Sequence, residues 1–462
     1  MPIQRLLIAN RGEIACRIIR SCQKLGIESV LAVSDADLNA LPARQADAVI
    51  RIGPAPSAQS YLNIGAIVQA AQDVGADAVH PGYGFLSENA ALGRSLMAAG
   101  IVFIGPSPAS LDAVGDKLSA RSHALAAGLP VVPGAAVSSA AEALTAAQAI
   151  GFPILLKAVS GGGGRGMKRV ESAELLAAAM SMAMAEAEAA FGDARVYLES
   201  FVAAGRHVEV QILGDGEQAI HLGDRDCSIQ RRYQKLLEEA PAPDLDPALR
   251  QAMATAAVDF ARHLHYRGAG TVEFLVDCQR QSFYFLEMNA RIQVEHPVTE
   301  MITGLDLVEE QILLAEGRPL RYRQEDIHCH GHAIECRINA EDSSRDFQPS
   351  PGTIVQAQFP VGPGIRVDTH VESALVIPPW YDSLLAKIIC HGSDRNQAII
   401  RMQTALANLR LSGVQTNTGL QQRLLLAPEV LAGGMQTSFF PAFMQASTDS
   451  SADNSGGRHD GH

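Results

Sequence analysis

Polar residues occupy every second position of the segment Glu287-Met288-Asn289-Ala290-Arg291-Ile292-Gln293-Val294-Glu295. In an extended backbone these side chains point to one face, with same-face neighbours roughly 6–7 Å apart. That face carries carboxylate, amide and guanidinium groups. It can therefore hold a divalent cation at one end and an anion beside a base at the other. The alternative interpretation is a solvated strand with surface salt bridges.

The composition limits the classes of protein to consider. The chain has 462 residues, enough for roughly two to four domains, and its formal net charge of −13 argues against a nucleic-acid partner. No apolar run approaches the ~18 residues of a membrane span, and Met1–Ile8 is too weakly apolar for a signal peptide. The seven cysteines are scattered and form no Cys-x-x-Cys pair. This favours reduced thiols and a cytoplasmic protein with no membrane association.

Strand and helix patterns alternate from Arg5 to about Ile104. Arg5–Asn10 has the pattern of a buried strand, a tight turn follows at Gly12, and residues 14–25 have a helical period. This alternation predicts a doubly wound parallel sheet in residues 1–114. The loop 79–89 follows a strand of that sheet, where ligands bind in such folds.

The pattern changes near residues 115 and 333. We expect residues 115–332 to form a second domain. Its expected strands are 154–159, 196–201, 207–213, 270–276 and 282–288, and its expected helices are 117–128, 139–150 and 171–190. Residues 333–445 have short strands and turns, then a strand and a helix, which indicates a C-terminal mixed α/β domain. The fold class is therefore α/β with α+β parts. Residues 446–462 contain no large apolar residue and are expected to be a disordered tail.

A glycine-rich loop occupies residues 161–167. Gly161, Gly163 and Gly166 satisfy the Gly-x-Gly-x-x-Gly pattern, but a short strand at 168–170 follows instead of a helix, so we expect a hairpin tip and not a dinucleotide fold. No Gly-Lys-Ser/Thr follows, which excludes a Walker A loop. The loop suits a mobile flap whose backbone N–H groups close over phosphates, with Lys157 as a phosphate ligand and Lys117 as a weaker candidate.

Two glutamates lie among apolar residues in strands that a polar turn connects, at Glu273 and Glu287. Buried carboxylates repel each other unless a cation lies between them. With Asn289 they suit nucleotide-bound Mg²⁺. The alternative is two unrelated salt-bridged glutamates.

Other residues that could bind a metal have simpler explanations. His328, His330 and His332 alternate, but no carboxylate or cysteine at fixed spacing completes a zinc site, so we expect structural or surface roles. Cys227 lies in an arginine-rich segment and is expected to serve ordinary packing.

Six segments together resemble one family. They are Ile8–Ala15, His80–Asn89, the loop 161–167, Arg225–Arg232, Glu287–Thr299 and Glu335–Asp342. In this order they resemble biotin carboxylase, the ATP-grasp component of biotin-dependent carboxylases, from about residue 3 to residue 445. The resemblance implies an N-terminal biotin carboxylase domain at 1–114, an ATP-grasp domain at 115–332 with a lid at about 132–203, and a C-terminal biotin carboxylase domain at 333–445.

The resemblance also implies a role for each matching position. ATP contacts are implied for Lys117, Lys157, Gly163, Gly164, Glu199, Ser200, Phe201, Val202, His207, Gln230, Tyr233, Glu273 and Glu287. Two Mg²⁺ or Mn²⁺ ions are implied, with Glu273, Glu287 and Asn289 as metal ligands. Contacts with bicarbonate and biotin are implied for Lys235, Arg291, Gln293, Val294 and Arg337. The implied catalytic residues are Glu295, Arg291, Arg337 and Lys235.

The implied reaction is ATP-dependent carboxylation of biotin. Bicarbonate is a poor nucleophile until it is deprotonated, and Arg291 can position it while Glu295 takes the proton. The products are ADP and carboxyphosphate, which decomposes to CO₂ and phosphate. Phosphate then deprotonates biotin, and Arg337 stabilises the enolate that attacks CO₂. A backbone contact at Val294 requires a bend, so we expect the alternation of the opening segment to break near Val294.

Two positions depart from the family pattern. Tyr233 stands where histidine is common; it can hydrogen-bond a ribose or phosphate but cannot carry positive charge. Ser160 stands where glycine is usual at the start of the flap. None of the charged catalytic positions is altered.

The expected partners follow from the same resemblance. No biotinyl-acceptor sequence of the Ala-Met-Lys-Met type occurs, so we expect biotin as a substrate on a separate carrier protein. We expect carboxyltransferase subunits as further partners, in an acetyl-CoA carboxylase. Another acyl-CoA carboxylase, a biotin-independent ATP-grasp ligase and a non-catalytic nucleotide-binding scaffold remain alternatives. The resemblance implies a homodimer, although Lys24 and the turn 361–365 depart from the expected interface.

Overall fold

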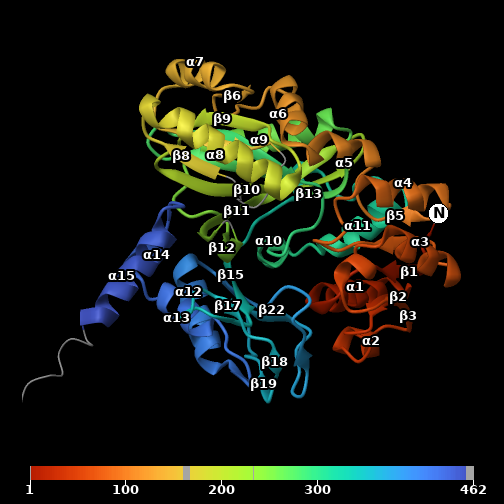
Figure 1. The fold of residues 1–462 in the computed structure, drawn as a ribbon. Helices are drawn as coiled ribbons and strands as arrows, with labels where there is room; N and C mark the ends of the chain where they lie inside the picture. Colours follow the sequence, from red (N-terminus) through yellow and green to blue (C-terminus); the bar gives the residue numbers. More distant parts are fainter. Residues whose placement is uncertain (1, 160–166, 233, 454–462) are drawn as a thin grey trace, which may run out of the picture.

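The structure is a computed structural model that describes residues 2–159, 167–232 and 234–453 (Figure 1). The N-terminal region is a five-stranded parallel sheet in the order β3-β2-β1-β4-β5. Its strands are β1 (Arg5–Ile8), β2 (Glu28–Ser34), β3 (Ala48–Gly53), β4 (Ala78–His80) and β5 (Val102–Phe103). The helices beside them are α1 (Gly12–Leu25), α2 (Leu41–Gln45), α3 (Ile64–Asp73) and α4 (Ala90–Ala98).

Alternate residues of β1 bury opposite faces of this sheet. Leu6 and Ile8 pack in a core with α1, whereas Leu7 packs in a core with α3 and α4. Successive side chains of a strand point to opposite faces, so a strand covered on both sides is apolar throughout. The predicted doubly wound parallel sheet is confirmed.

A smaller antiparallel sheet forms a separate layer, at the top of Figure 1. Its order is β6-β9-β7-β8, with β6 (Gly134–Val137), β7 (Ile154–Ala158), β8 (Met167–Val170) and β9 (Val196–Ser200). Helices α7 (Ala140–Ile150) and α8 (Ala173–Phe191) pack on it around their own apolar core. Strands β7 and β8 pair antiparallel with Lys157 opposite Met167, as the hairpin prediction requires. The tip at 160–166, with Gly163 and Gly164, lies outside the described residues, as does Tyr233.

The largest sheet has eight strands in the order β14-β13-β10-β11-β12-β15-β22-β20. They are β10 (Gly205–Asp215), β11 (Ala219–Arg231), β12 (Gln234–Ala240), β13 (Arg267–Asp277), β14 (Ser282–Asn289), β15 (His332–Asn339), β20 (Ile365–Thr369) and β22 (Leu384–Gly392). Strand β12 pairs with β15, with Glu238 opposite Glu335. The sheet therefore continues across the expected domain boundary at 332/333, which brings side chains from both sides of that boundary onto one surface.

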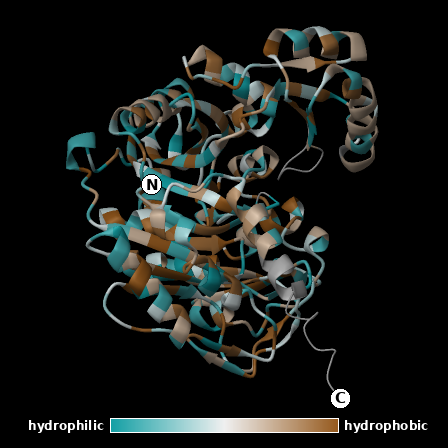
Figure 2. Ribbon diagram, turned by 90° about the vertical axis from the view of Figure 1, so that its left-hand side faces the viewer, coloured by the Kyte–Doolittle hydropathy of each residue, from teal (hydrophilic) through white to brown (hydrophobic). Residues whose placement is uncertain are grey.

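Helices cover the large sheet and connect it to its neighbours. They are α5 (Pro108–Gly115), α6 (Lys117–Ala126), α9 (Pro247–His263), α10 (His296–Thr303), α11 (Leu307–Ala315), α12 (Arg395–Asn408), α13 (Thr418–Leu424) and α14 (Pro428–Ala432). Two short 3₁₀ turns lie at Ser57–Gln59 and Gln324–Asp326. Figure 2 shows hydrophobic residues along the central strands, where these helices pack. Among the described residues, no helix has the length and apolar character needed to cross a bilayer.

Short strands lie in the C-terminal region, as expected. β18 (Gly352–Thr353) pairs with β21 (Val376–Ile377), and β19 (Gln356–Gln358) pairs with β23 (Arg410–Ser412). A further short pair joins β16 (Glu341–Asp342) to β17 (Gln348–Pro349). The mixed α/β character expected for this region is confirmed.

Helix α15 (Phe439–Asp453), with Phe440 buried in its first turn, extends over the first residues of the expected tail at 446–462. Residues 454–462 lie outside the described residues, and the disordered tail stays a prediction. One expectation needs correction: the opening polar segment leaves the extended conformation earlier than Val294. Strand β14 ends at Asn289, and residues 290–295 form a bend before α10 begins at His296.

Candidate functional site

Four charged residues stand directly opposite one another across four adjacent strands. Arg225 on β11 is opposite Glu209 on β10, Glu209 is opposite Glu273 on β13, and Glu273 is opposite Glu287 on β14. Directly opposed residues of antiparallel strands share a face of the sheet. This row, called the charged row below, places three carboxylates and one guanidinium on that face.

Lys235 of β12 contacts two acids of the charged row and also Glu295 of the bend. Its Nζ lies 2.5 Å from Glu209 Oε2, 2.9 Å from Glu273 Oε1 and 2.6 Å from Glu295 Oε1. Burial alone would lower the pKa of this lysine, but the surrounding acids raise it well above its usual value. Lys235 is therefore a fixed cation at the point where the sheet meets the bend 290–295.

Glu295 is the last residue of that bend, and two cations hold its carboxylate. Lys235 contacts Oε1, and Arg337 Nη2 of β15 donates to Oε2 over 2.8 Å. Burial opposes ionisation of Glu295, but these cations outweigh it and lower the pKa of the carboxyl. The carboxylate is thus ionised and oriented, as a proton acceptor must be.

Arg337 also bonds a second buried acid. Its Nε donates to Glu238 Oε1 over 2.6 Å, and Glu238 lies on β12 opposite Glu335. Burial, together with the charge of Glu295, raises the pKa of Glu238 to about 7. Arg337 therefore bridges Glu238 and Glu295 with one guanidinium.

Glu273 and Glu287 supply an acidic pair at the other end of the charged row. Burial raises the pKa of Glu287, and the nearby Glu273 raises it further, whereas Lys117 acts in the opposite direction. Burial also opposes ionisation of Glu273, but Lys235 and His207 hold the pKa of Glu273 well below its usual value. Asn289 Nδ2 donates to Glu273 Oε1 over 2.8 Å. Hard oxygen atoms from two carboxylates and one amide are a donor set that suits Mg²⁺ or Mn²⁺.

His207 on β10 supplies a cation beside this pair. Its Nε2 lies 2.9 Å from Glu273 Oε2. Burial lowers the pKa of the imidazole, but Glu273 and Glu209 outweigh it and raise that pKa to about 9. The imidazole therefore carries a positive charge at neutral pH in this structure.

The bend residues are fixed by contacts from several parts of the chain. Arg291 Nη2 donates to Asn289 Oδ1 over 2.8 Å, and Arg291 Nε donates to Glu88 Oε2 over 3.0 Å. Gln293 Nε2 donates to Glu273 Oε1 over 2.9 Å. The Val294 carbonyl accepts a hydrogen bond of 2.9 Å from Lys387 Nζ.

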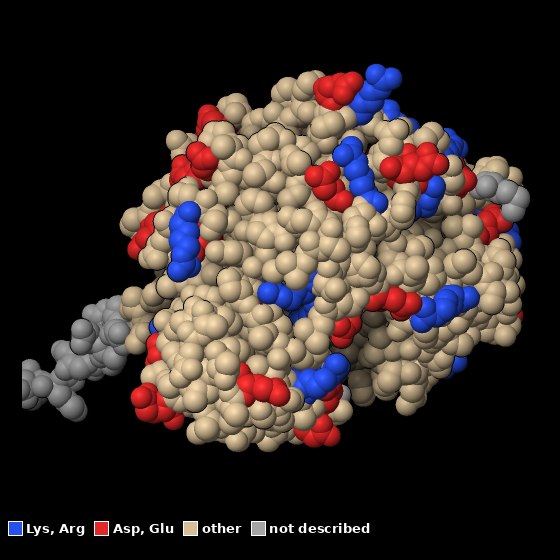
Figure 3. All heavy atoms as spheres, turned by 90° about the horizontal axis from the view of Figure 1, so that it is seen from above, with Lys and Arg blue, Asp and Glu red and all other residues tan. Residues whose placement is uncertain are grey.

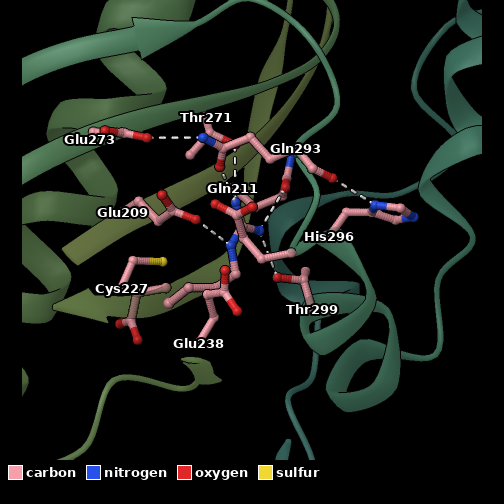
Figure 4. A network of polar contacts seen from close by, with 12 residues as sticks. Glu209, Gln211, Cys227, Glu238, Thr271, Glu273, Gln293, His296 and Thr299 are labelled. Atoms are coloured by element: carbon pink, nitrogen blue, oxygen red, sulfur yellow. Dashed lines mark hydrogen bonds and ion pairs between the residues drawn. The ribbon is translucent and has the colours of Figure 1, made fainter. Parts of the chain in front are cut away.

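Arg225 holds the centre of the site together. Its guanidinium donates to Glu209, Gln211, Thr299, Thr271 and Gln293 over 2.5–3.1 Å, and its side chain has no exposed surface. Figure 4 labels these five partners. These partners come from β10, β13, α10 and the bend. One buried cation thus connects the sheet to the segment that carries Glu295.

The described residues that are expected to contact ATP lie on the smaller sheet, on the segment after it, on the large sheet and at the start of α6. Lys157 and Glu199 form an ion pair on β7 and β9 of the smaller sheet, and among the described residues no bond joins that pair to the cluster around Lys235. Ser200, Phe201 and Val202 lead from β9 to the large sheet. Gln230 donates to the Cys227 carbonyl over 2.6 Å. Lys117 lies at the first position of α6, and its charge acts on that of Glu287.

Several residues of the cluster were not assigned by sequence reasoning. Glu88 and Arg225 lie in segments that carry the family resemblance but were given no role, whereas Glu209, Glu238 and Lys387 lie outside those segments. The alternation His207, Glu209, Gln211 in a predicted strand was a usable signal for Glu209. The partners of Arg225 and Lys387 lie far away in sequence, so no local pattern indicates them.

The remaining candidate ligands fit the simpler expectations. Cys227 is buried, and burial, reinforced by the charge of Glu209, raises the pKa of its thiol well above the usual range. His332 bonds the buried Glu239 over 2.8 Å, whereas His328 and His330 are exposed. Charges of both signs are interspersed over the face seen in Figure 3, and no single-sign patch dominates that part of the described surface.

Three family models match consecutive parts of the chain. Residues 2–111 match "Biotin carboxylase, N-terminal domain" and residues 335–442 match "Biotin carboxylase C-terminal domain". Residues 116–323 match "Carbamoyl-phosphate synthase L chain, ATP binding domain".

Similar proteins cover almost the whole chain. A biotin carboxylase from Nostoc sp. is 51% identical over 442 residues, which cover 95% of this chain and 99% of the relative. A relative from Methanothermobacter thermautotrophicus, which is named as part of a pyruvate carboxylase, is 49% identical over 439 residues, which cover 94% of this chain and 89% of the relative.

Solved structures also resemble this chain over almost its whole length. A Campylobacter jejuni biotin carboxylase in complex with β,γ-ATP has a TM-score of 0.92 and 44% identity, covering 95% of this chain and 99% of that one. The biotin carboxylase domain dimer of Hydrogenobacter thermophilus 2-oxoglutarate carboxylase, with MgADP, ADP and bicarbonate, has a TM-score of 0.91 and 43% identity, covering 96% and 98%.

Proposed function

The chain belongs to the biotin carboxylase family of ATP-grasp ligases, and we propose that it carboxylates biotin on a separate carrier protein as one component of an acetyl-CoA carboxylase. The observation that carries the proposal is the meeting of Lys235, Glu295 and Arg337. Lys235 Nζ and Arg337 Nη2 lie 2.6 Å and 2.8 Å from the two oxygens of one carboxylate. A base held between two cations suits a substrate that is itself an anion carrying a proton.

Glu295 is the proposed base for bicarbonate. Arg291, with Lys235 and the backbone at Val294, is proposed to hold the anion so that its proton faces Glu295. Lys235 lowers the pKa of Glu295 most strongly among the cations. When Lys235 transfers its contact to the bound anion, Glu295 loses part of that stabilisation and becomes a stronger base.

The charged row and the lid are proposed to bind the nucleotide. Glu273, Glu287 and Asn289 would hold Mg²⁺ or Mn²⁺, because the mutual repulsion of the two carboxylates is relieved by a cation. Two ions are proposed. When bound, the metal neutralises phosphate charge during transfer. Lys117, Lys157, His207 and Gln230, with Gly163, Gly164, Tyr233 and the segment 199–202, are proposed as further ATP contacts.

Arg337 is the proposed contact for biotin. Deprotonated bicarbonate attacks the γ-phosphorus of ATP to give carboxyphosphate and ADP, and carboxyphosphate then yields CO₂ and phosphate. Phosphate takes the N1′ proton of biotin, and the Arg337 guanidinium stabilises the enolate oxygen while N1′ attacks CO₂. Gln293 would help to orient the substrates, because its amide is fixed between Arg225 and Glu273.

The partners and the acyl acceptor are also proposed. The relative from Nostoc sp. is named simply biotin carboxylase, and a biotin carrier protein and carboxyltransferase subunits are the proposed partners. Relatives named for pyruvate and 2-oxoglutarate carboxylation favour a second candidate acceptor of the 2-oxo acid class. We also propose a homodimer, since one neighbour is a domain dimer. The seven free cysteines fit a cytoplasmic location.

Two experiments test the function. The purified protein should hydrolyse ATP in a bicarbonate-dependent manner, and free biotin should stimulate the reaction. A rate of ATP hydrolysis that does not change when biotin is added would indicate a biotin-independent ligase. Recovery of biotinylated carrier in a pull-down, followed by transfer of labelled carboxylate to acetyl-CoA or to pyruvate with the recovered carboxyltransferase, identifies the acceptor.

A further inference from the structure

Lys387 is a fully buried cation outside the residues assigned above. It lies on β22, and its side chain has no exposed surface. Its Nζ donates to the Val294 carbonyl over 2.9 Å and lies 3.0 Å from Glu13 Oε1. Asp368 Oδ2 lies 4.0 Å away. A buried ammonium needs such partners, because desolvation without them costs several kcal/mol.

The position of Lys387 in the large sheet connects it to Arg337. Arg337 on β15 is directly opposite Lys387 on β22, and Lys387 is directly opposite Asp368 on β20. Opposed residues share one face of the sheet. Arg337 contacts the Glu295 carboxylate and Lys387 contacts the Val294 carbonyl, so two neighbouring cations hold two consecutive residues of the bend.

The other side of Lys387 is anchored in the N-terminal region. Glu13 lies in the first turn of α1, and Tyr83, from the loop after β4, donates its hydroxyl to Glu13 Oε1. Asp368 is bonded in turn by Arg366 over 2.7 Å. Lys387 therefore joins α1, the C-terminal strands and the bend through one ammonium group.

The contact with Val294 fixes a peptide plane. The carbonyl of Val294 and the N–H of Glu295 belong to the same planar peptide unit, so holding the carbonyl also sets the direction of that N–H and of the Glu295 Cα. The neighbouring carbonyls of the bend are held differently: Gln293 O contacts His296 Nδ1 at 2.7 Å, and Glu295 O accepts from the Val298 amide. Lys387 is thus the side chain that orients the peptide leading into Glu295.

We propose that Lys387 is a positioning residue for the bicarbonate site, which aligns Glu295 and the adjoining peptide with the substrate through the Val294 carbonyl. The inference rests on the proposed role of Glu295 as the base. Lys387 touches no reacting atom, so its effect is on the geometry of the bend. Small displacements of reacting groups can cost about 100-fold in rate.

The test compares three variants in steady-state assays of bicarbonate-dependent ATP hydrolysis. Lys387→Met in combination with Glu13→Gln removes the ammonium without leaving its counter-charge buried alone. Glu13→Gln by itself is the matched control, because it retains the bond from Lys387 to Val294. Arg395→Met is the structural control: it removes another cation that pairs with a buried acid, Glu239, over 2.7 Å but does not contact the bend.

The double variant should lower kcat about 10- to 100-fold and raise KM for bicarbonate, while KM for ATP stays within about twofold. Both control variants should keep the bicarbonate KM of the unaltered protein, even where their melting temperatures fall equally. A double variant with the bicarbonate KM and kcat of Glu13→Gln overturns the positioning role alone. If the unaltered protein shows no bicarbonate-dependent hydrolysis, the proposed function fails, and the positioning role fails with it.

Discussion

Lys235 Nζ lies 2.6 Å from Glu295 Oε1, although the two residues come from a strand in the middle of the large sheet and from a bend that follows its edge strand. The same ammonium contacts Glu209 and Glu273. One lysine is therefore shared among three carboxylates. Binding of an anionic substrate has to compete with these acids for Lys235, which links substrate binding to the protonation of Glu295.

Replacing the proposed base tests that link. Glu295→Gln keeps a hydrogen-bond acceptor for Arg337 and Lys235 but cannot take a proton, so kcat for bicarbonate-dependent ATP hydrolysis should fall about 10²- to 10⁴-fold. KM for ATP should change less, since Glu295 is not among the residues proposed to contact ATP or the metal. Steady-state assays with varied bicarbonate and varied ATP separate the two effects. Near-normal turnover would exclude Glu295 as the base.

Arg337 is expected to matter most for biotin. Arg337→Lys keeps a positive charge but loses the forked contact that bridges Glu238 and Glu295. Biotin carboxylation should fall about 100-fold, and bicarbonate-dependent ATP hydrolysis should fall less, because the enolate needs a planar donor only in the later step. Parallel measurement of ADP and carboxybiotin in one reaction gives the ratio. Equal losses in both would argue against a specific role in the biotin step.

Magnesium dependence should change when the acidic pair loses one charge. Glu287→Gln removes one carboxylate of the donor set, so the Mg²⁺ concentration for half-maximal ATP turnover should rise about 10- to 100-fold. A titration of Mg²⁺ at saturating ATP measures this shift. Glu171→Gln, at an exposed carboxylate that pairs with Arg169 outside the cluster, is the control. An unchanged Mg²⁺ titration would remove Glu287 from the metal site.

The protonated His207 predicts a pH dependence of stability. Its pKa is raised from 6.5 to about 9, so its contribution is fully present below pH 6.5 and is lost as the pH rises through 9. The unfolding free energy of the unaltered protein should exceed that of His207→Gln by about 3 kcal/mol more at pH 6 than at pH 10. Denaturant unfolding without nucleotide at several pH values gives the difference. Parallel stability curves would show that the imidazole is neutral.

Replacing Arg225 is expected to lower the stability of the folded protein. Arg225→Met removes a fully buried cation with five polar partners and should lower the unfolding free energy by about 3–5 kcal/mol. The surface pair Arg94 and Asp112 offers a matched control, for which Arg94→Met should cost less than about 1 kcal/mol. Chemical denaturation of both variants checks the contrast. Similar small losses would mean that the network around Arg225 relaxes easily.

Much of the fold is predictable from local patterns. The apolar run of β1, the strand patterns at 207–213 and 282–288 and the hairpin of β7 and β8 each follow from side chains close in sequence, because strand and helix periods are local properties. The end of the last helix is less predictable: α15 runs to Asp453, although residues 446–453 contain no large apolar residue.

Local sequence is enough to show which residue types are available: Glu287, Asn289, Arg291, Gln293 and Glu295 in one short segment, and the motifs that identify the family. Which charges meet depends on the three-dimensional fold. Strand register placed Glu209 and Glu273 opposite each other, the bend after Asn289 turned Glu295 toward Lys235 and Arg337, and Lys387 reached Val294 from a distant strand. The reason is physical: side-chain direction depends on neighbouring residues, whereas the pairing of buried charges depends on the register of strands far apart in the chain.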